Sequence, residues 1–71
     1  MKQPLTNAQS QVLKFVRMYL KKYGIPPTRQ EITTGFGWSS ANAAQQHLVA
    51  IQRKGYIEFV GRKSRGIRVV A

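Results

Sequence analysis

The side chains best suited to a chemical task in this sequence are amides. Asn42, Gln45, Gln46 and Val49 are spaced i, i+3, i+4, i+7, which places them on one face of an α-helix. Because an amide donates and accepts at once, Asn or Gln can pair bidentately with N6 and N7 of adenine in the DNA major groove. The stripe indicates a base-reading surface. The alternative is an ordinary solvated helix face, since Gln is also a good helix former.

The composition around the stripe favours the base-reading interpretation. Residues 39–52 carry no formal charge, whereas a merely solvated face in so basic a chain would be expected to mix Lys and Glu. Small residues at the start of this helix would let its first turn approach a groove, where free N–H groups and the helix dipole favour phosphate. The same residues could instead serve only as a cap followed by good helix formers. We expect Ser39, Ser40 and Asn42 to contact DNA.

Cations surround this neutral stretch. The chain has 12 Lys and Arg against Glu31 and Glu58, a formal net charge of +10 at pH 7. Such an excess destabilises a compact chain by self-repulsion unless a polyanion screens it. Residues 61–66 place three cations and a hydroxyl at a predicted hairpin tip, which could follow phosphates or enter a minor groove. The alternative is an edge hairpin whose charges prevent sheet-to-sheet pairing.

Few residues are candidates for catalysis or metal binding. The sequence has no cysteine and one histidine, His47, which excludes thiolate chemistry, disulfides and a His or Cys metal cluster. His47 falls on the packing face of its helix, and helix capping explains Glu31. We therefore expect a protein that is not an enzyme and has no catalytic residue, metal, cofactor or small-molecule substrate.

Capping signals and apolar periodicity predict three helices. Thr6 and Thr28 each open a capping box, and the first helix should run from Asn7 to an αL stop at Gly24. The second is short, with Gly35 and Gly37 ending it within about two turns. The third extends from about residue 40 to 54, with Gly55 behind it, after a turn in which either Ser39 or Ser40 could be the cap.

Two β-rich runs, residues 56–60 and 67–70, predict a closing hairpin around the basic loop. Together these elements predict an α+β fold: a three-helix winged helix-turn-helix with a C-terminal two-stranded β-hairpin wing, forming a single domain over residues 1–71. The core should be formed by the apolar stripes of the first and third helices: Val12, Phe15, Val16, Tyr19, Leu20, Tyr23, Ala44, His47, Leu48 and Ile51.

No apolar run approaches the roughly 20 residues of a membrane span, and the N-terminus lacks the apolar region of a secretory signal. We expect no membrane partner and a cytoplasmic, nucleoid-associated protein of a bacterial or phage-infected cell.

Several motifs occur in the order and spacing of one known family: residues 25–32 (IPPTRQEI), 40–44 (SANAA), 47–48 (HL), 53–58 (RKGYIE) and 64–68 (SRGIR). With Leu5-Thr6 at the start, the sequence resembles the N-terminal DNA-binding domain of the LexA-type SOS repressors over essentially its whole length. The resemblance implies a winged helix-turn-helix that binds a palindromic operator as a dimer. It also implies a recognition helix in the major groove and a wing beside the neighbouring phosphates.

Carried over from the family, the base-reading positions are Ser40, Asn42, Ala43, Gln45 and Gln46. Well-known members have Glu at the last two, and Glu accepts from cytosine N4 whereas Gln prefers adenine, so a different operator is expected. LexA-type repressors continue into a peptidase domain with a Ser-Lys dyad. The 71 residues do not include it, so we expect no self-cleavage and at most a weak homodimer on DNA.

The leading hypothesis is a sequence-specific double-stranded DNA-binding transcriptional regulator, a repressor or operator competitor. An alternative is a small phage-type regulator that binds a host protein such as RNA polymerase or a repressor. The predicted base-reading residues are Ser39, Ser40, Asn42, Ala43, Gln45 and Gln46, and the predicted backbone contacts are Thr28, Arg29, Arg53, Arg62, Lys63, Ser64 and Arg65.

Overall fold

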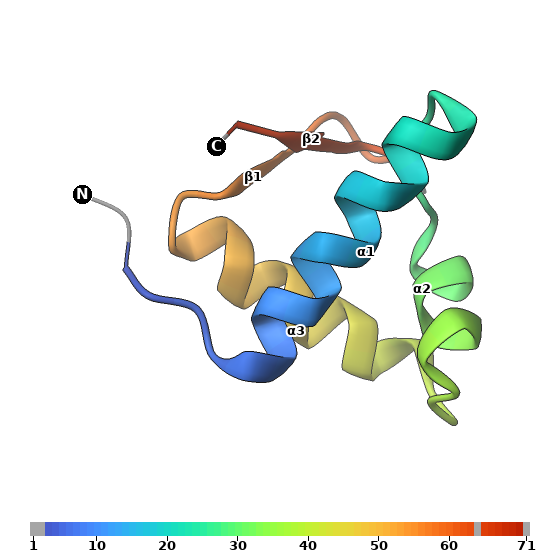
Figure 1. Cartoon of the computed structure of the whole chain (residues 1–71), viewed down its shortest axis with the longest axis horizontal. Helices are drawn as coiled ribbons and strands as arrows, with labels where there is room; N and C mark the ends of the chain where they lie inside the picture. The colour runs from blue at the N-terminus through green and yellow to red at the C-terminus, as the bar shows by residue number, and fades with distance from the viewer. Residues whose placement is uncertain (1–2, 64, 71) are drawn as a thin grey trace.

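Three helices and a hairpin follow one another in the computed structural model of the chain, which describes residues 3–63 and 65–70. The helices are α1 (Asn7–Tyr23), α2 (Arg29–Phe36) and α3 (Ala41–Arg53), and the strands are β1 (Ile57–Phe59) and β2 (Ile67–Val69). Figure 1 shows α1 crossing in front of α3, with α2 to one side and the hairpin above. The predicted α+β winged helix-turn-helix is confirmed.

Both predicted capping boxes are present. The Thr6 hydroxyl accepts from the Gln9 backbone N–H at 3.2 Å, and the Thr6 N–H donates to Gln9 Oε1 at 3.1 Å. At α2 the Thr28 hydroxyl accepts from the Glu31 N–H at 3.0 Å, and the Thr28 N–H donates to Glu31 Oε1 at 2.8 Å. Because each box satisfies two orphan donors of a first turn, both helices begin where the sequence predicts.

The turn between α2 and α3 differs from the expectation in one detail. The sequence predicts that Gly35 and Gly37 both end α2. In the structure only Gly37, with φ of 70°, is the C-cap, and Gly35 lies inside the helix. A Cβ on Gly35 would lie 2.6 Å from the Phe15 ring, so the missing side chain lets α1 and α2 approach closely. Ser40 rather than Ser39 then caps α3, its hydroxyl accepting from the Asn42 N–H at 3.2 Å.

The core lies where α1, α2, α3 and the base of the hairpin meet. Ala44, Leu48 and Ile51 are fully buried, and His47 beside them is half-buried, so the packing face predicted for α3 is confirmed. The buried apolar residues are Val12, Leu13, Val16, Ile32, Ala44, Leu48, Ile51, Ile57 and Ile67.

The stripe predicted for α1 is only partly right. Leu13, which the stripe omitted, is buried, whereas Tyr23 at the end of the stripe is 55% exposed. The reason is length: α1 has 17 residues, α2 has 8 and α3 has 13, so the last turn of α1 extends beyond the helices that cover it. Figure 1 shows this end of α1 standing clear of α3.

The two strands pair in antiparallel register, with Glu58 opposite Arg68, and these two side chains form an ion pair. Each strand is shorter than predicted. The loop closes tightly, because the Val60 N–H donates to the Gly66 carbonyl at 2.8 Å. A Cβ on Gly66 would lie 2.3 Å from the Val60 carbonyl oxygen, so the wing needs glycine there.

Lys54, at the end of α3, holds the segment that precedes α1. Its Nζ donates to the Pro4 carbonyl at 3.0 Å and to Gln9 Oε1 at 2.6 Å. No helix within the described residues is long and apolar enough to cross a membrane.

Leu48→Ala should lower the free energy of unfolding by about 2–5 kcal/mol, because it removes buried methyl groups and leaves a cavity in a small core. Urea denaturation of the variant measures this. Met18→Ala is the matched control: Met18 is 57% exposed, and its loss should change stability by no more than about 0.5 kcal/mol. Equal effects of the two substitutions would contradict the placement of the core.

Candidate nucleic-acid interface

The predicted base-reading residues lie on the side of α3 that faces away from α1. Ser39, Ser40, Asn42 and Gln46 are exposed, and Ala43 and Gln45 are half-buried, while Ala44 and Leu48 on the other side are in the core. The six residues therefore form one continuous outward surface along the first half of α3 and the turn before it. That they read bases stays a prediction.

Gln45 is engaged by a residue of the preceding helix. Arg29 Nε donates a hydrogen bond to Gln45 Oε1, and the Arg29 guanidinium carbon lies 5.5 Å from the centroid of the Phe59 ring. Arg29 thus connects the start of α2 to both α3 and β1. A cation over an aromatic face is attracted by the ring quadrupole, which helps to hold this arrangement.

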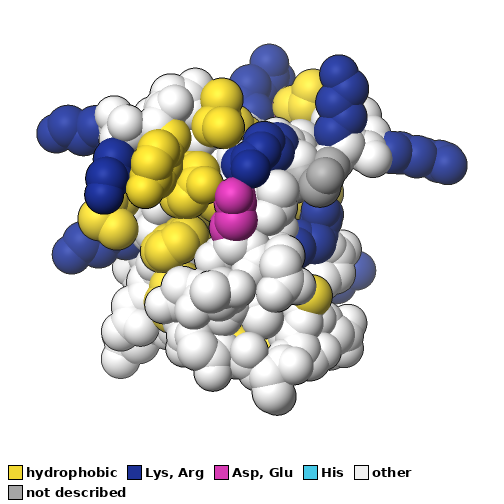
Figure 2. All heavy atoms as spheres, turned by 90° about the vertical axis from the view of Figure 1, so that its right-hand side faces the viewer, with side chains coloured by type: hydrophobic (Ala, Val, Ile, Leu, Met, Phe, Trp, Pro, Cys, Tyr) yellow, Lys and Arg dark blue, Asp and Glu magenta, His cyan; other side chains and the backbone are white. Residues whose placement is uncertain are grey.

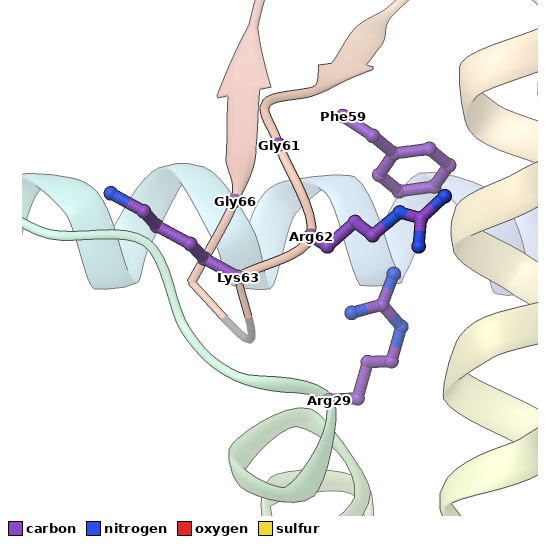
Figure 3. A pocket seen from close by; sticks show the side chains of 6 residues that line it. All are labelled: Arg29, Phe59, Gly61, Arg62, Lys63 and Gly66. Carbon is purple, nitrogen blue, oxygen red and sulfur yellow. The ribbon is translucent and has the colours of Figure 1, made fainter.

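Between the wing and the start of α2 there is an open pocket of about 490 Å³, lined by Arg29, Phe59, Gly61, Arg62, Lys63 and Gly66. In Figure 3 the guanidinium groups of Arg29 and Arg62 point toward each other beside the Phe59 ring, while the Lys63 amine points away from them. Two like charges that converge in this way repel each other, and an anion between them would relieve the repulsion. The pocket is suited to a phosphate of a nucleic-acid backbone.

Arg65 occupies a different position from the other wing cations. Its Nη1 donates to Glu31 Oε1 at 2.7 Å and to the Pro26 carbonyl at 2.9 Å, and its Nη2 donates to Glu31 Oε2 at 2.8 Å. This bidentate pair attaches the wing to the start of α2. The structure therefore gives Arg65 a role in the fold, and its contact with DNA stays a prediction. Ser64 lies outside the described residues.

The Glu31 carboxylate is strongly stabilised in its charged form. Hydrogen bonds from the Arg65 guanidinium and from the Thr28 backbone N–H lower the pKa of Glu31 from 4.5 to about 2. The sequence predicts only the capping role of this residue. It missed the ion pair because the two partners lie 34 positions apart.

The remaining predicted backbone contacts are in varied environments. Thr28 uses its hydroxyl in the α2 cap, whereas Arg53 is exposed in the last turn of α3. In Figure 2, Lys and Arg side chains crowd the upper part of the face shown, around the end of α1 and the hairpin. The lower part, over α2 and the turn that follows it, is largely uncharged.

His47 packs as the sequence indicated. Its ring stacks on Trp38 at 5.1 Å between centroids, and Trp38 stacks on Phe36 at 4.8 Å, so the aromatic rings connect α3 to α2 across the turn. Within residues 3–63 and 65–70, no group of three or more His, Cys, Asp or Glu is placed to hold a metal ion.

Phe59 and the link between Arg29 and Gln45 are the parts of the site that sequence reasoning missed. Arg29 and Gln45 are separated by 16 positions, a distance at which no local spacing rule applies. Phe59 belongs to a three-residue strand whose sides alternate between core and surface. Its aromatic side chain next to a basic loop was the one available signal.

Glu31→Gln should remove the ion pair but keep the capping box, because Gln also serves at this helix position. Since the Glu31 pKa is lowered on folding, its charge stabilises the fold fully above the unfolded pKa and loses this effect as the pH falls toward 2. Urea unfolding from about pH 6 to about pH 2 should show the stability difference between the two proteins shrinking with pH. A difference that stays constant would contradict the assigned pair.

Comparison with known proteins matches the LexA DNA binding domain to residues 2–66. The LexA repressor of Marinobacter nauticus is 55% identical over 65 residues, covering 92% of this chain and 32% of the relative. That of Leptothrix cholodnii is 52% identical over 65 residues, with 92% and 28% covered, and that of Colwellia psychrerythraea is 49% identical over 67, with 94% and 32% covered. The chain thus spans about a third of the length of these relatives. It belongs to the LexA DNA-binding domain family.

Proposed function

We propose that this domain binds double-stranded DNA sequence-specifically and acts as a transcriptional repressor or operator competitor. In this proposal α3 lies in the major groove and the hairpin lies on the sugar-phosphate backbone. One observation carries it: the exposed amide face of α3 has no formal charge, and the cationic pocket of the wing opens beside it. The relatives named LexA repressors support the same function.

The separation of charge from amides matches the two tasks of a DNA-binding domain. Phosphate contacts position a protein and raise affinity for any sequence, whereas contacts to base edges supply specificity. Arg29, Arg62 and Lys63 line the pocket, and Asn42 and Gln46 are exposed on the neighbouring helix. Because these groups lie on different elements, both kinds of contact can form at the same time.

The operator proposed here is palindromic and is bound by two copies of the domain as a weak homodimer on DNA. In helix-turn-helix proteins, two-fold protein symmetry is matched by half-sites about 10 base pairs, or a multiple of that spacing, apart. The proposed site of action is the cytoplasm of a bacterial or phage-infected cell, where the domain is associated with the nucleoid.

A groove on α1 favours protein binding as the second candidate function. Phe15, Met18, Tyr19, Lys22 and Tyr23 line a groove of about 210 Å³ at the end of α1, away from the amide face of α3. Met18 and Tyr23 are more than half exposed there. An exposed apolar groove with a cationic edge is a recognised feature of protein-binding surfaces.

Selection from random duplex DNA tests the proposed function. We expect an enriched sequence with two inverted half-sites, because each copy of α3 would read one half-site. A single enriched half-site would show binding by one copy and overturn the dimer. Absence of any enriched sequence would overturn sequence-specific reading and favour the protein-binding candidate.

Gln46→Ala should weaken binding to the selected site by about 1–3 kcal/mol and weaken binding to random DNA much less, because it removes a base contact. Gln52→Ala is a matched control, since Gln52 is an exposed amide in the last turn of α3, beyond the predicted base-reading residues. Fluorescence anisotropy titrations on both DNAs provide the measurement. Equal losses on the two DNAs would show that Gln46 does not read bases.

A further inference from the structure

The hydrogen bond between Arg29 and Gln45 has a consequence for which base is read. We propose that Arg29 is a positioning residue that fixes the orientation of the Gln45 amide, so that Gln45 presents a donor and not a donor–acceptor pair to DNA. This inference rests on the proposed function and deepens it, because it names the chemistry that Gln45 selects.

The orientation follows from the donor inventory of the two side chains. Arginine Nε carries a hydrogen and never accepts, so the Gln45 atom that faces it is the carbonyl oxygen, as the structure shows. Within the planar amide the NH₂ group then lies on the other branch. An isolated Gln at this position could turn either group outward, whereas a Gln tied to Arg29 presents its NH₂ group.

Arg29 is itself held in place, which makes the orientation persistent. Its guanidinium lies against the Phe59 ring, and Gln45 and Arg29 are both half-buried. A Gln45 amide that turned over would place its NH₂ group against the arginine N–H, two donors facing each other at a partly buried site. Leaving such polar groups unsatisfied is unfavourable.

The neighbouring amide behaves differently. Gln46 is exposed, and its side chain forms no hydrogen bond to any other residue in the described part of the chain. It keeps both its donor and its acceptor and can pair bidentately with adenine. Gln45, with its oxygen directed to Arg29, should instead prefer the base edge that offers two acceptors and no donor, which is O6 and N7 of guanine.

Two amides in succession therefore have different base preferences. The difference arises from a residue on α2 and not from the recognition helix alone. Arg29 then affects base contacts through Gln45 and phosphate contacts directly, since its guanidinium also lines the phosphate pocket.

The test compares base preferences across the selected site for the unaltered domain and for Gln45→Ala, Arg29→Ala and Arg62→Ala. Gln45→Ala identifies the base pair that Gln45 reads, as the position where preference is lost. At that position the unaltered domain should favour a G·C pair over an A·T pair, because guanine alone offers two acceptors to the NH₂ group. Arg29→Ala should shift the preference there from G·C toward A·T by roughly five- to 150-fold, the range of one bidentate contact, and leave the other positions unchanged.

Arg62→Ala is the matched control, because Arg62 lines the same pocket and is also a cation. It should weaken binding equally on all sequences and lower the salt slope by about 0.9 for one lost phosphate contact, with no change in base preference. If Arg29→Ala also weakened binding equally on all sequences with no change in base preference, the inference would be overturned and the proposed function would remain intact.

The base preference of the unaltered domain is a test that does not depend on how any arginine variant folds. An A·T pair preferred at the position assigned to Gln45 would overturn the inference, and a G·C pair there would support it. A domain that selects no sequence at all would instead refute the proposed function. The two failures are thus distinguishable.

Discussion

Glu31 is the side chain on which the arrangement of the domain depends. One of its oxygens closes the capping box of α2, and both accept from the Arg65 guanidinium at the base of the wing. Arg65 also donates to the Pro26 carbonyl in the segment before α2. A single carboxylate therefore links the start of α2 to the base of the wing. The chain has only two acidic residues and a net charge of +10, so one of its two carboxylates serves to join α2 to the wing.

The Lys and Arg side chains of the domain differ from one another in their roles. Arg65 is paired with Glu31 and Lys54 holds the N-terminal segment, so both cations have partners within the fold. Arg29 and Arg62 instead converge on an open pocket beside the wing, where a bound anion would relieve their mutual repulsion. The net charge thus overstates the number of groups available to DNA, and their position matters more than their count.

The helices and the core face of α3 could be predicted because their causes are local. A Thr followed three positions later by Gln or Glu satisfies backbone donors of the same turn, and the spacing of Ala44, Leu48 and Ile51 defines a face regardless of the partner. The amide stripe follows from the same periodicity. The end of α1 could not be predicted in this way, because Tyr23 is exposed or buried according to how far neighbouring helices extend.

The sequence by itself determined the order of the elements, the family, the apolar face of α3 and the composition of the surface opposite. Only the tertiary structure decided what each cation does. It paired Arg65 with Glu31 and brought Arg29 to Gln45 and Phe59. The physical reason is that a charged or amide side chain has no fixed partner in the sequence. Its role depends on which groups the packing of the helices places within hydrogen-bonding distance.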